Sequence, residues 1–353
     1  MTTNIKHCRE HFYSAISVYS ETILPFLGAL TLLSFLPAFL YGCSAPEPLL
    51  YPAGEVSINV DLTKGAGNVD ELDIFVFRND RLQKTDCYQK VPDLESWNRE
   101  VVSGYGDRII AVCANCRKDI MEWVGVSSFP YLQNLSVSLE DDDPESPFMS
   151  GWKEVSSGSE GRHIQMQLSP LTSIVRLQSI SCDFSGRPYS GEKMTDVRIY
   201  LTNVSAECRL FDEKGIMPVR VVNAGGLCED DMEAFRDASV LYQELPYDIG
   251  SETIRPDISL ICYPNNSPSE SPGTPFTRLV IEGKIGGQTY YWPIDINRDD
   301  GGEGIARNEK YIYDIRIRRK GTLDPDTPAR TEDMDISFKI EKWEEQEDYK
   351  VTF

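Results

Sequence analysis

Histidine is nearly missing from this chain of 353 residues, where it occurs only as His7, His11 and His163. A Ser/His/Asp or Cys/His catalytic arrangement, or an imidazole-based metal site, needs at least one well-placed histidine. The first two lie in a segment that we expect to be removed, which leaves His163 in an alternating stretch whose polar face suits it. We therefore predict no catalytic residue, no metal site and no cofactor.

Positive charge is also scarce. The chain has 35 Lys and Arg against 56 Asp and Glu, for a formal net charge of −21. A surface this acidic argues against binding nucleic acid and against electrostatic attachment to anionic lipid. Any attachment to a membrane must therefore rely on lipid or on an apolar segment.

An uncharged run from Ile23 to Tyr41 ends in Leu40-Tyr41-Gly42-Cys43, which matches the lipobox of bacterial lipoproteins. A small residue before the cysteine lets signal peptidase reach the bond, and the thiol accepts a diacylglycerol group. Each buried CH₂ of an acyl chain adds about 0.8 kcal/mol, so a triacylated terminus holds a protein durably at a bilayer. We predict that residues 1–42 are a signal peptide, cut between Gly42 and Cys43, and that Cys43 carries outer-membrane lipid.

A transmembrane anchor is the alternative reading of the same run, because roughly 20 apolar residues can span a hydrocarbon core. Pro25, Gly28 and Pro37 interrupt the run, however, and no Lys or Arg follows Cys43 until Lys64. The positive flank that stops transfer of a spanning helix is therefore missing.

Seven cysteines follow Cys43, an odd number that cannot all pair within the chain. Cys113-Ala-Asn-Cys116 is a CxxC, which is compatible with a redox pair or half of a zinc site. There is no second CxxC, and the motif directly follows a strand-like run. Ordinary buried or edge thiols are the favoured interpretation.

Apolar residues alternate with polar ones in short runs across the whole mature sequence, which is typical of strands. The predicted strands include 56–62, 72–77, 108–112, 135–139, 164–168, 174–180 and 197–201. Helices are predicted only at 117–123 and 229–241, the second with an acidic start. Gly286-Gly287 between β-rich arms predicts a tight hairpin, and Pro293 predicts that its second arm lies at an edge.

Loop-forming stretches separate these runs, at 140–147, 156–161 and 265–273, and each is predicted to be solvated. One alternating run ends near Pro170 and another begins at Ile174. The expected fold is all-β, with few short helices and with β-sandwich domains at 43–169 and 170–353.

Several short motifs, in the right order over nearly the whole mature chain, resemble the FimB-like and fimbrillin-like lipoproteins of anaerobic Gram-negative bacteria. The motifs are the lipobox, the first strand Val56 to Leu62, Val76-Phe-Arg-Asn79, the turn Phe148-Met149-Ser150-Gly151, Leu171 to Leu177, Tyr290 to Pro293, Ala306-Arg-Asn308 with Tyr311, Gly321 to Pro325, and Lys342-Trp343. Phe148 stands where the family usually has proline.

The resemblance implies two transthyretin-like β-sandwiches in tandem, without an active site, that assemble with other fimbrial subunits by donor-strand exchange. In the family's stalk subunits an arginine-specific protease cuts after the first strand. Here the corresponding loop contains Lys64, and no Arg occurs between Cys43 and Arg78. We expect an uncut fimbrial anchor or minor subunit at the outer membrane, with a host surface as a further candidate partner. The candidate donor strand lies within Met334 to Phe353 and contains Ile336, Phe338, Ile340 and Trp343.

Two other functions stay open. A surface glycan-binding lipoprotein would need an exposed aromatic platform, for which Tyr290, Tyr291 and Trp292 are candidates, although core packing is the favoured use of the face shared by Tyr290 and Trp292. A thiol oxidoreductase would use Cys113 and Cys116.

Overall fold

The computed structural model describes residues 56–64, 68–104, 106–118, 123–156, 163–211, 220–330 and 332–343. Cys43 and the lipobox residues Leu40, Tyr41 and Gly42 lie outside these ranges, as do residues 344–353. Residues 54–353 group into one compact unit. Within the described ranges, no helix is both long enough and apolar enough to cross a bilayer.

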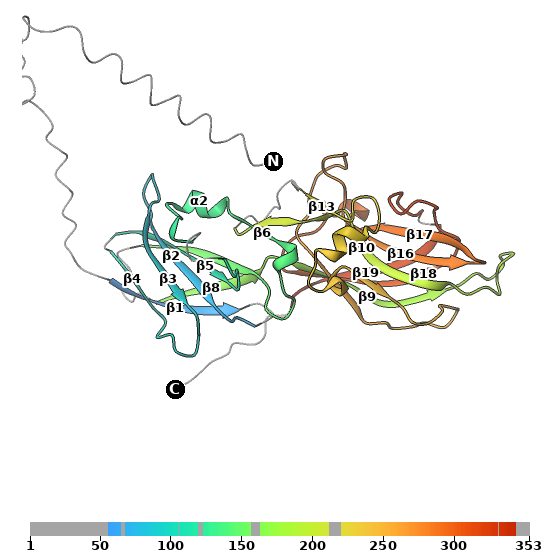
Figure 1. The fold of residues 1–353 in the computed structure, drawn as a ribbon, viewed down its shortest axis with the longest axis horizontal. Helices are drawn as coiled ribbons and strands as arrows, with labels where there is room; N and C mark the ends of the chain where they lie inside the picture. Colours follow the sequence, from blue (N-terminus) through green and yellow to red (C-terminus); the bar gives the residue numbers. More distant parts are fainter. Residues whose placement is uncertain are drawn as a thin grey trace, which may run out of the picture. The chain divides into compact units, whose positions relative to one another are not determined.

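Seven strands of the first half form one sheet in the order β3-β2-β5-β7-β8-β1-β4 (Figure 1). Its strands are β1 (Val56–Lys64), β2 (Leu72–Arg78), β3 (Thr85–Val91), β4 (Glu100–Ser103), β5 (Arg108–Ala114), β7 (Met149–Val155) and β8 (His163–Pro170). Neighbouring strands are antiparallel except β1 and β8, which are parallel.

This sheet curls so that its two edge strands, β3 and β4, contact each other. Asp86 of β3 links them, because its Oδ2 accepts a hydrogen bond at 3.2 Å from the N–H of Gly104, which directly follows β4. The same oxygen accepts one at 3.0 Å from Nε of Arg108, at the start of β5. The residues enclosed by the curl include Leu72, Ile74, Val76, Ile110, Val112, Met149, Met166 and Leu168. Phe75 and Phe77 point to the other face and join a second, larger core. Strand β2 is therefore buried on both faces.

Two four-stranded sheets make up most of the second half, and their inner faces bury side chains in that larger core. One sheet has the order β14 (Tyr242–Glu244), β10 (Thr195–Thr202), β16 (Arg278–Ile285) and β17 (Gln288–Asp295). The other has the order β15 (Ile258–Cys262), β9 (Ser173–Cys182), β18 (Glu309–Ile317) and β19 (Met334–Lys342). Two small pairs are β6 (Ser136–Ser138) with β12 (Glu207–Arg209), and β11 (Val204–Ser205) with β13 (Val221–Val222).

Helices are few and short, as predicted. They are α2 (Phe129–Gln133), α3 (Glu229–Glu233) and the 3₁₀ turns η1 (Leu139–Asp141), η2 (Ala238–Val240) and η3 (Asp299–Gly301). The prediction of one helix over 229–241 is wrong. Asp237 accepts a hydrogen bond from Ser239 N at 2.9 Å and so starts a separate turn. Residues 119–122 of the helix predicted at 117–123 lie outside the described ranges.

The predicted hairpin is confirmed. Strands β16 and β17 pair from Arg278↔Asp295 to Ile285↔Gln288, and both linking glycines have positive φ angles, 61° at Gly286 and 80° at Gly287. A two-residue turn with positive φ at both positions matches the twist of the strands, and only glycine adopts it without strain. Pro293 lies on β17, which is an edge strand as predicted.

The four residues that resemble the family's turn do not form one here. Met149, Ser150 and Gly151 begin β7, and Met149 pairs with Ala114 on one side and Pro170 on the other. The side chains of Phe148 and Met149 are both buried, so packing holds this segment extended. Gly151 allows β7 to approach β8 closely, because a Cβ there would overlap with the carbonyl oxygen of Gln167.

Candidate functional site

Strand β1 occupies an internal position of the seven-stranded sheet. It pairs with β4 from Val56↔Ser103 to Asn59↔Glu100, and with β8 from Asn59↔His163 to Lys64↔Leu168. The expectation that Lys64 lies in the loop after the first strand is wrong, because the pairing with β8 extends β1 to Lys64. The first described strand thus completes two hydrogen-bond ladders. Without β1, both β8 and β4 would present unpaired N–H and C=O groups.

Strand β19 lies at the edge of its sheet and pairs only with β18 among the described strands, from Glu309↔Lys342 to Ile317↔Met334. Ile336, Phe338 and Ile340 point to the same face of the sheet, where they are 37%, 37% and 43% exposed. Phe338 stacks on Tyr313 of β18 with ring centroids 5.5 Å apart. The three candidate donor residues therefore form a half-exposed apolar stripe on an edge strand.

Trp343, the fourth candidate donor residue, is buried at 7% exposure and follows the end of β19. Its backbone N–H donates to Asn308 O at 3.3 Å. It also lines a large cavity, and its side chain is more buried than those of the stripe.

The two halves of the chain meet at Arg307, which lies in the Ala306-Arg-Asn308 motif. Its Nη2 donates to Ser169 O at 2.6 Å and to Ser150 Oγ at 3.2 Å, and its Nε donates to Pro170 O at 3.2 Å. Ser150 Oγ in turn donates to Leu210 O. Strand pairing between β6 and β12 crosses the same junction. The motif residue Arg307 thus fastens the second half of the chain to β7 and β8 of the first.

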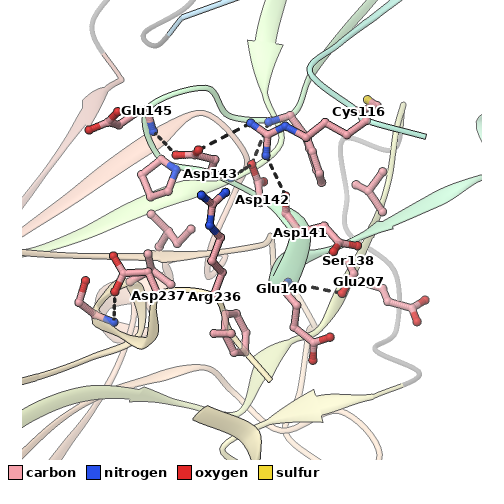
Figure 2. A pocket seen from close by; sticks show the side chains of 18 of the residues that line it. Cys116, Ser138, Glu140, Asp141, Asp142, Asp143, Glu145, Glu207, Arg236 and Asp237 are labelled. Carbon is pink, nitrogen blue, oxygen red and sulfur yellow. Dashed lines mark hydrogen bonds and ion pairs between the residues drawn. The ribbon is translucent and has the colours of Figure 1, made fainter. Parts of the chain in front are cut away.

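A cavity of about 1110 Å³ lies between the loop after β6 and the segment of α3 and η2 (Figure 2). Its acidic lining residues are Glu140, Asp141, Asp142, Asp143, Glu145, Glu207 and Asp237, and its basic ones are Arg117, Lys118 and Arg236. The loop at 140–147 was predicted to be solvated, but Ser146 within it and Phe148 directly after it are buried. The amino-acid composition of the loop could not show that it packs against the second half of the chain.

Asp142 is the most constrained carboxylate of this cavity. Its Oδ1 accepts hydrogen bonds from the backbone N–H groups of Asp143 and Phe148, both at 2.9 Å, and its Oδ2 accepts one from Tyr263 OH at 3.3 Å. Burial raises the pKa of Asp142 to about 7, although these hydrogen bonds and nearby Arg117 oppose the rise. Its charge state therefore changes near neutral pH, at a contact between the two halves.

No histidine lies among the described residues that line the cavity, and Cys116 is the one thiol among them. Burial raises the pKa of neighbouring Cys113 well above its usual value, which disfavours the nucleophilic thiolate. All seven cysteines in the described ranges are free thiols. Among those residues, no three His, Cys, Asp or Glu side chains are grouped so that they could hold a metal ion.

The aromatic platform considered for glycan binding is absent at the residues first named for it. Trp292 is fully buried, and its Nε1 donates to Arg319 O at 3.0 Å. Tyr290 packs against it with ring centroids 6.5 Å apart. The face shared by these two residues therefore serves the core.

No protein-family model and no curated protein sequence matches this chain. Solved structures do match it in fold. They include proteins described as cell adhesion proteins from Bacteroides eggerthii (TM-score 0.60, 15% identity) and Parabacteroides distasonis (TM-score 0.59, 16% identity), each covering 82% of this chain and 96% of its own. A fimbrilin from Porphyromonas gingivalis matches with a TM-score of 0.57 and 13% identity, over 82% of this chain and 97% of its own. The chain thus has the mainly β fold of Bacteroidales fimbrilins and cell adhesion proteins.

Proposed function

We propose that this chain is a non-enzymatic, lipid-anchored subunit at the base of a surface fimbria, built from two transthyretin-like domains at 43–169 and 170–353. It assembles with other fimbrial subunits by donor-strand exchange at the outer membrane. The observation that carries the proposal is the placement of β1 between β4 and β8, in a fold shared with a fimbrilin.

The physical basis is the cost of unpaired strand edges. A sheet that loses an internal strand exposes two rows of backbone donors and acceptors together with an apolar groove, and an extended segment from a neighbour satisfies both. In this chain β1 fills that position itself, through its ladders with β4 and β8. A subunit that keeps β1 cannot accept a donor there, and so it terminates the polymer at that end.

The predicted lipid fits a terminal position. Cys43 precedes the start of β1 at Val56 by 13 residues, which span at most about 45 Å when fully extended. A cut after β1 would separate the lipid from the folded protein. The loop after β1 offers no arginine, because none occurs between Cys43 and Arg78. Anchoring therefore depends on β1 staying attached.

The outward partner surface is assigned to the stripe of Ile336, Phe338 and Ile340 on β19. An edge strand with an exposed apolar face is a template for pairing with another chain, and soluble proteins rarely leave one uncovered. The opposite face of β19 carries Asp335, Ser337, Lys339 and Glu341, which is the alternation that a donor strand needs.

The test of anchoring is a Lys64→Arg variant expressed with an alkynyl fatty acid in a lipoprotein-processing host. An arginine-specific protease should leave the label on the wild-type folded domain, and should release an unlabelled domain from the variant. A Lys84→Arg variant, which changes a residue on the far side of β2, is the matched control. Label that persists in a Cys43→Ser protein would contradict lipidation at Cys43, and donor binding by uncut wild type would contradict the terminal role.

The test of the donor stripe is a Phe338→Asp variant, with Ser337→Asp on the opposite face of β19 as its control. We expect Phe338→Asp to reduce recovery of partner subunits in a pull-down from fimbriated cells at least tenfold, and Ser337→Asp to leave it unchanged. Circular dichroism and melting temperature check that both variants fold. Equal recovery with both variants would remove the stripe from the assembly interface.

A further inference from the structure

The only exposed tryptophan among the described residues stands beside a small hollow. Trp152 of β7 is 44% exposed, whereas Trp123, Trp292 and Trp343 are buried and Trp97 is partly covered. The hollow has a volume of about 430 Å³, within the range of small-molecule sites, and Phe211, Gln167 and Asn308 also line it. An exposed indole at the rim of a hollow offers a flat apolar surface to a ligand.

The indole is held in place from one side. Its ring lies 5.2 Å from that of Phe129, which is buried and in turn lies 6.0 Å from the ring of Phe211. Residues two apart on a strand share a face, so Trp152 points to the same side of the sheet as Ser150. Because packing against Phe129 fixes the ring, little conformational entropy would be lost when a ligand stacks on its exposed part.

Polar groups complete the opposite wall. Glu309 Oε1 accepts a hydrogen bond from Lys342 Nζ at 3.2 Å, and its Oε2 accepts one from Tyr311 OH at 3.1 Å, so this carboxylate is preoriented. Asn308 also lines the hollow and is partly exposed. Its side-chain amide is a candidate partner for a ligand hydroxyl.

We propose that this hollow binds a neutral hexose unit of a glycan, with the C–H face of the sugar stacked on Trp152 and its hydroxyls paired with Asn308, Glu309 and Lys342. A sugar fits this hollow because a pyranose has an apolar C–H face for the indole ring and hydroxyl groups for the polar side chains. The negative face of an aromatic ring attracts the weakly positive C–H face of a pyranose, and hydroxyls both donate and accept. A purely apolar ligand would displace water from Glu309 and Lys342 without offering hydrogen bonds in its place.

The hollow does not include the apolar stripe used for assembly. It lies on β7, β8, the 306–309 segment, Phe211 and Lys342 at the end of β19, and none of Ile336, Phe338 and Ile340 lines it. The binding of a glycan and the assembly of a fimbria can therefore fail or succeed independently.

The experiment begins with the labelled mature lipoprotein in detergent on an array of neutral and acidic oligosaccharides, followed by titration calorimetry with the best neutral hexose oligosaccharide. We expect Trp152→Ala to weaken binding at least tenfold, Asn308→Ala to weaken it three- to tenfold, and Trp152→Phe to weaken it less than Trp152→Ala. Tyr247→Ala, at an exposed tyrosine outside the hollow, is the control and should bind as the wild type does.

A second readout does not depend on substitution. Because Trp152 is the exposed tryptophan, bound oligosaccharide should protect the protein's fluorescence from iodide quenching. Binding that is absent from the whole array, restricted to acidic glycans, or unchanged in a folded Trp152→Ala variant would overturn the proposal. Loss of subunit co-purification in Trp152→Ala without any glycan binding would overturn it as well, and would assign the hollow to a protein contact.

Discussion

Replacing Arg307 with alanine should weaken the junction between the two halves of the chain more than any surface substitution. The guanidinium makes three contacts of 3.2 Å or less, to Ser169 O, Ser150 Oγ and Pro170 O. Two further contacts, to Ser150 O at 3.4 Å and Leu210 O at 3.5 Å, are at the limit of a hydrogen bond.

The magnitude follows from the three shorter contacts. A hydrogen bond to a charged group contributes about 1.5–3 kcal/mol, but Arg307 is only partly buried and water can reach some of its partners. We therefore expect Arg307→Ala to lower the free energy of unfolding by about 3 kcal/mol. Arg307→Lys keeps the charge but loses the planar fork, so it should cost about half as much.

Urea denaturation of the purified mature chain measures both losses, with the m-value as a check that the unfolded states are comparable. A double-mutant cycle with Ser150→Ala isolates the contact to its hydroxyl, and we expect a coupling energy of about 1 kcal/mol. A loss below about 1 kcal/mol in Arg307→Ala, or a coupling near zero, would refute the view that this side chain fastens the two halves.

Two further predictions concern partly buried positions. Because the pKa of Asp142 is raised to about 7 in the folded state, the native protein holds this proton more tightly and loses stability as pH rises from about 4 to 7. In urea titrations, the free energy of unfolding of Asp142→Asn should match that of the wild type near pH 4 and exceed it by about 2 kcal/mol at pH 8. Parallel pH profiles for the two proteins would contradict a raised pKa at Asp142 as the cause. Gly321→Ala should lower stability by about 2–3 kcal/mol because its Cβ would overlap the carbonyl of Tyr291. Gly191→Ala, in open space, should change the melting temperature little.

Strands with clear alternation were predictable from sequence because their period of two follows directly from having one face buried. The runs at 56–62, 72–77, 108–112 and 197–201 are confirmed in β1, β2, β5 and β10. The hairpin around Gly286 was predictable for a second reason, since its turn needs positive φ angles that glycine supplies.

The candidate surfaces were less predictable because they depend on contacts between distant segments. Asp142 belongs to an acidic run that reads as solvated, but it accepts hydrogen bonds from Phe148 N and from Tyr263 OH in the other half. Trp152 directly follows the segment that resembles a turn, and it lies in a strand because it pairs with β5. Neither local composition nor spacing carries that information.

The order of the strands within the sheets distinguishes two roles that the same alternating sequence pattern can have. Ile58 of β1 and Ile336 of β19 both belong to runs that alternate apolar and polar residues, yet among the described strands β1 has a partner on each side and β19 has one. The number of ladders decides what each strand can do: removing β1 breaks two, whereas freeing β19 breaks only its ladder with β18. Releasing a strand that has one ladder to a neighbouring subunit therefore costs less free energy than releasing a strand that has two. The strand with two ladders is expected to stay in its own sheet.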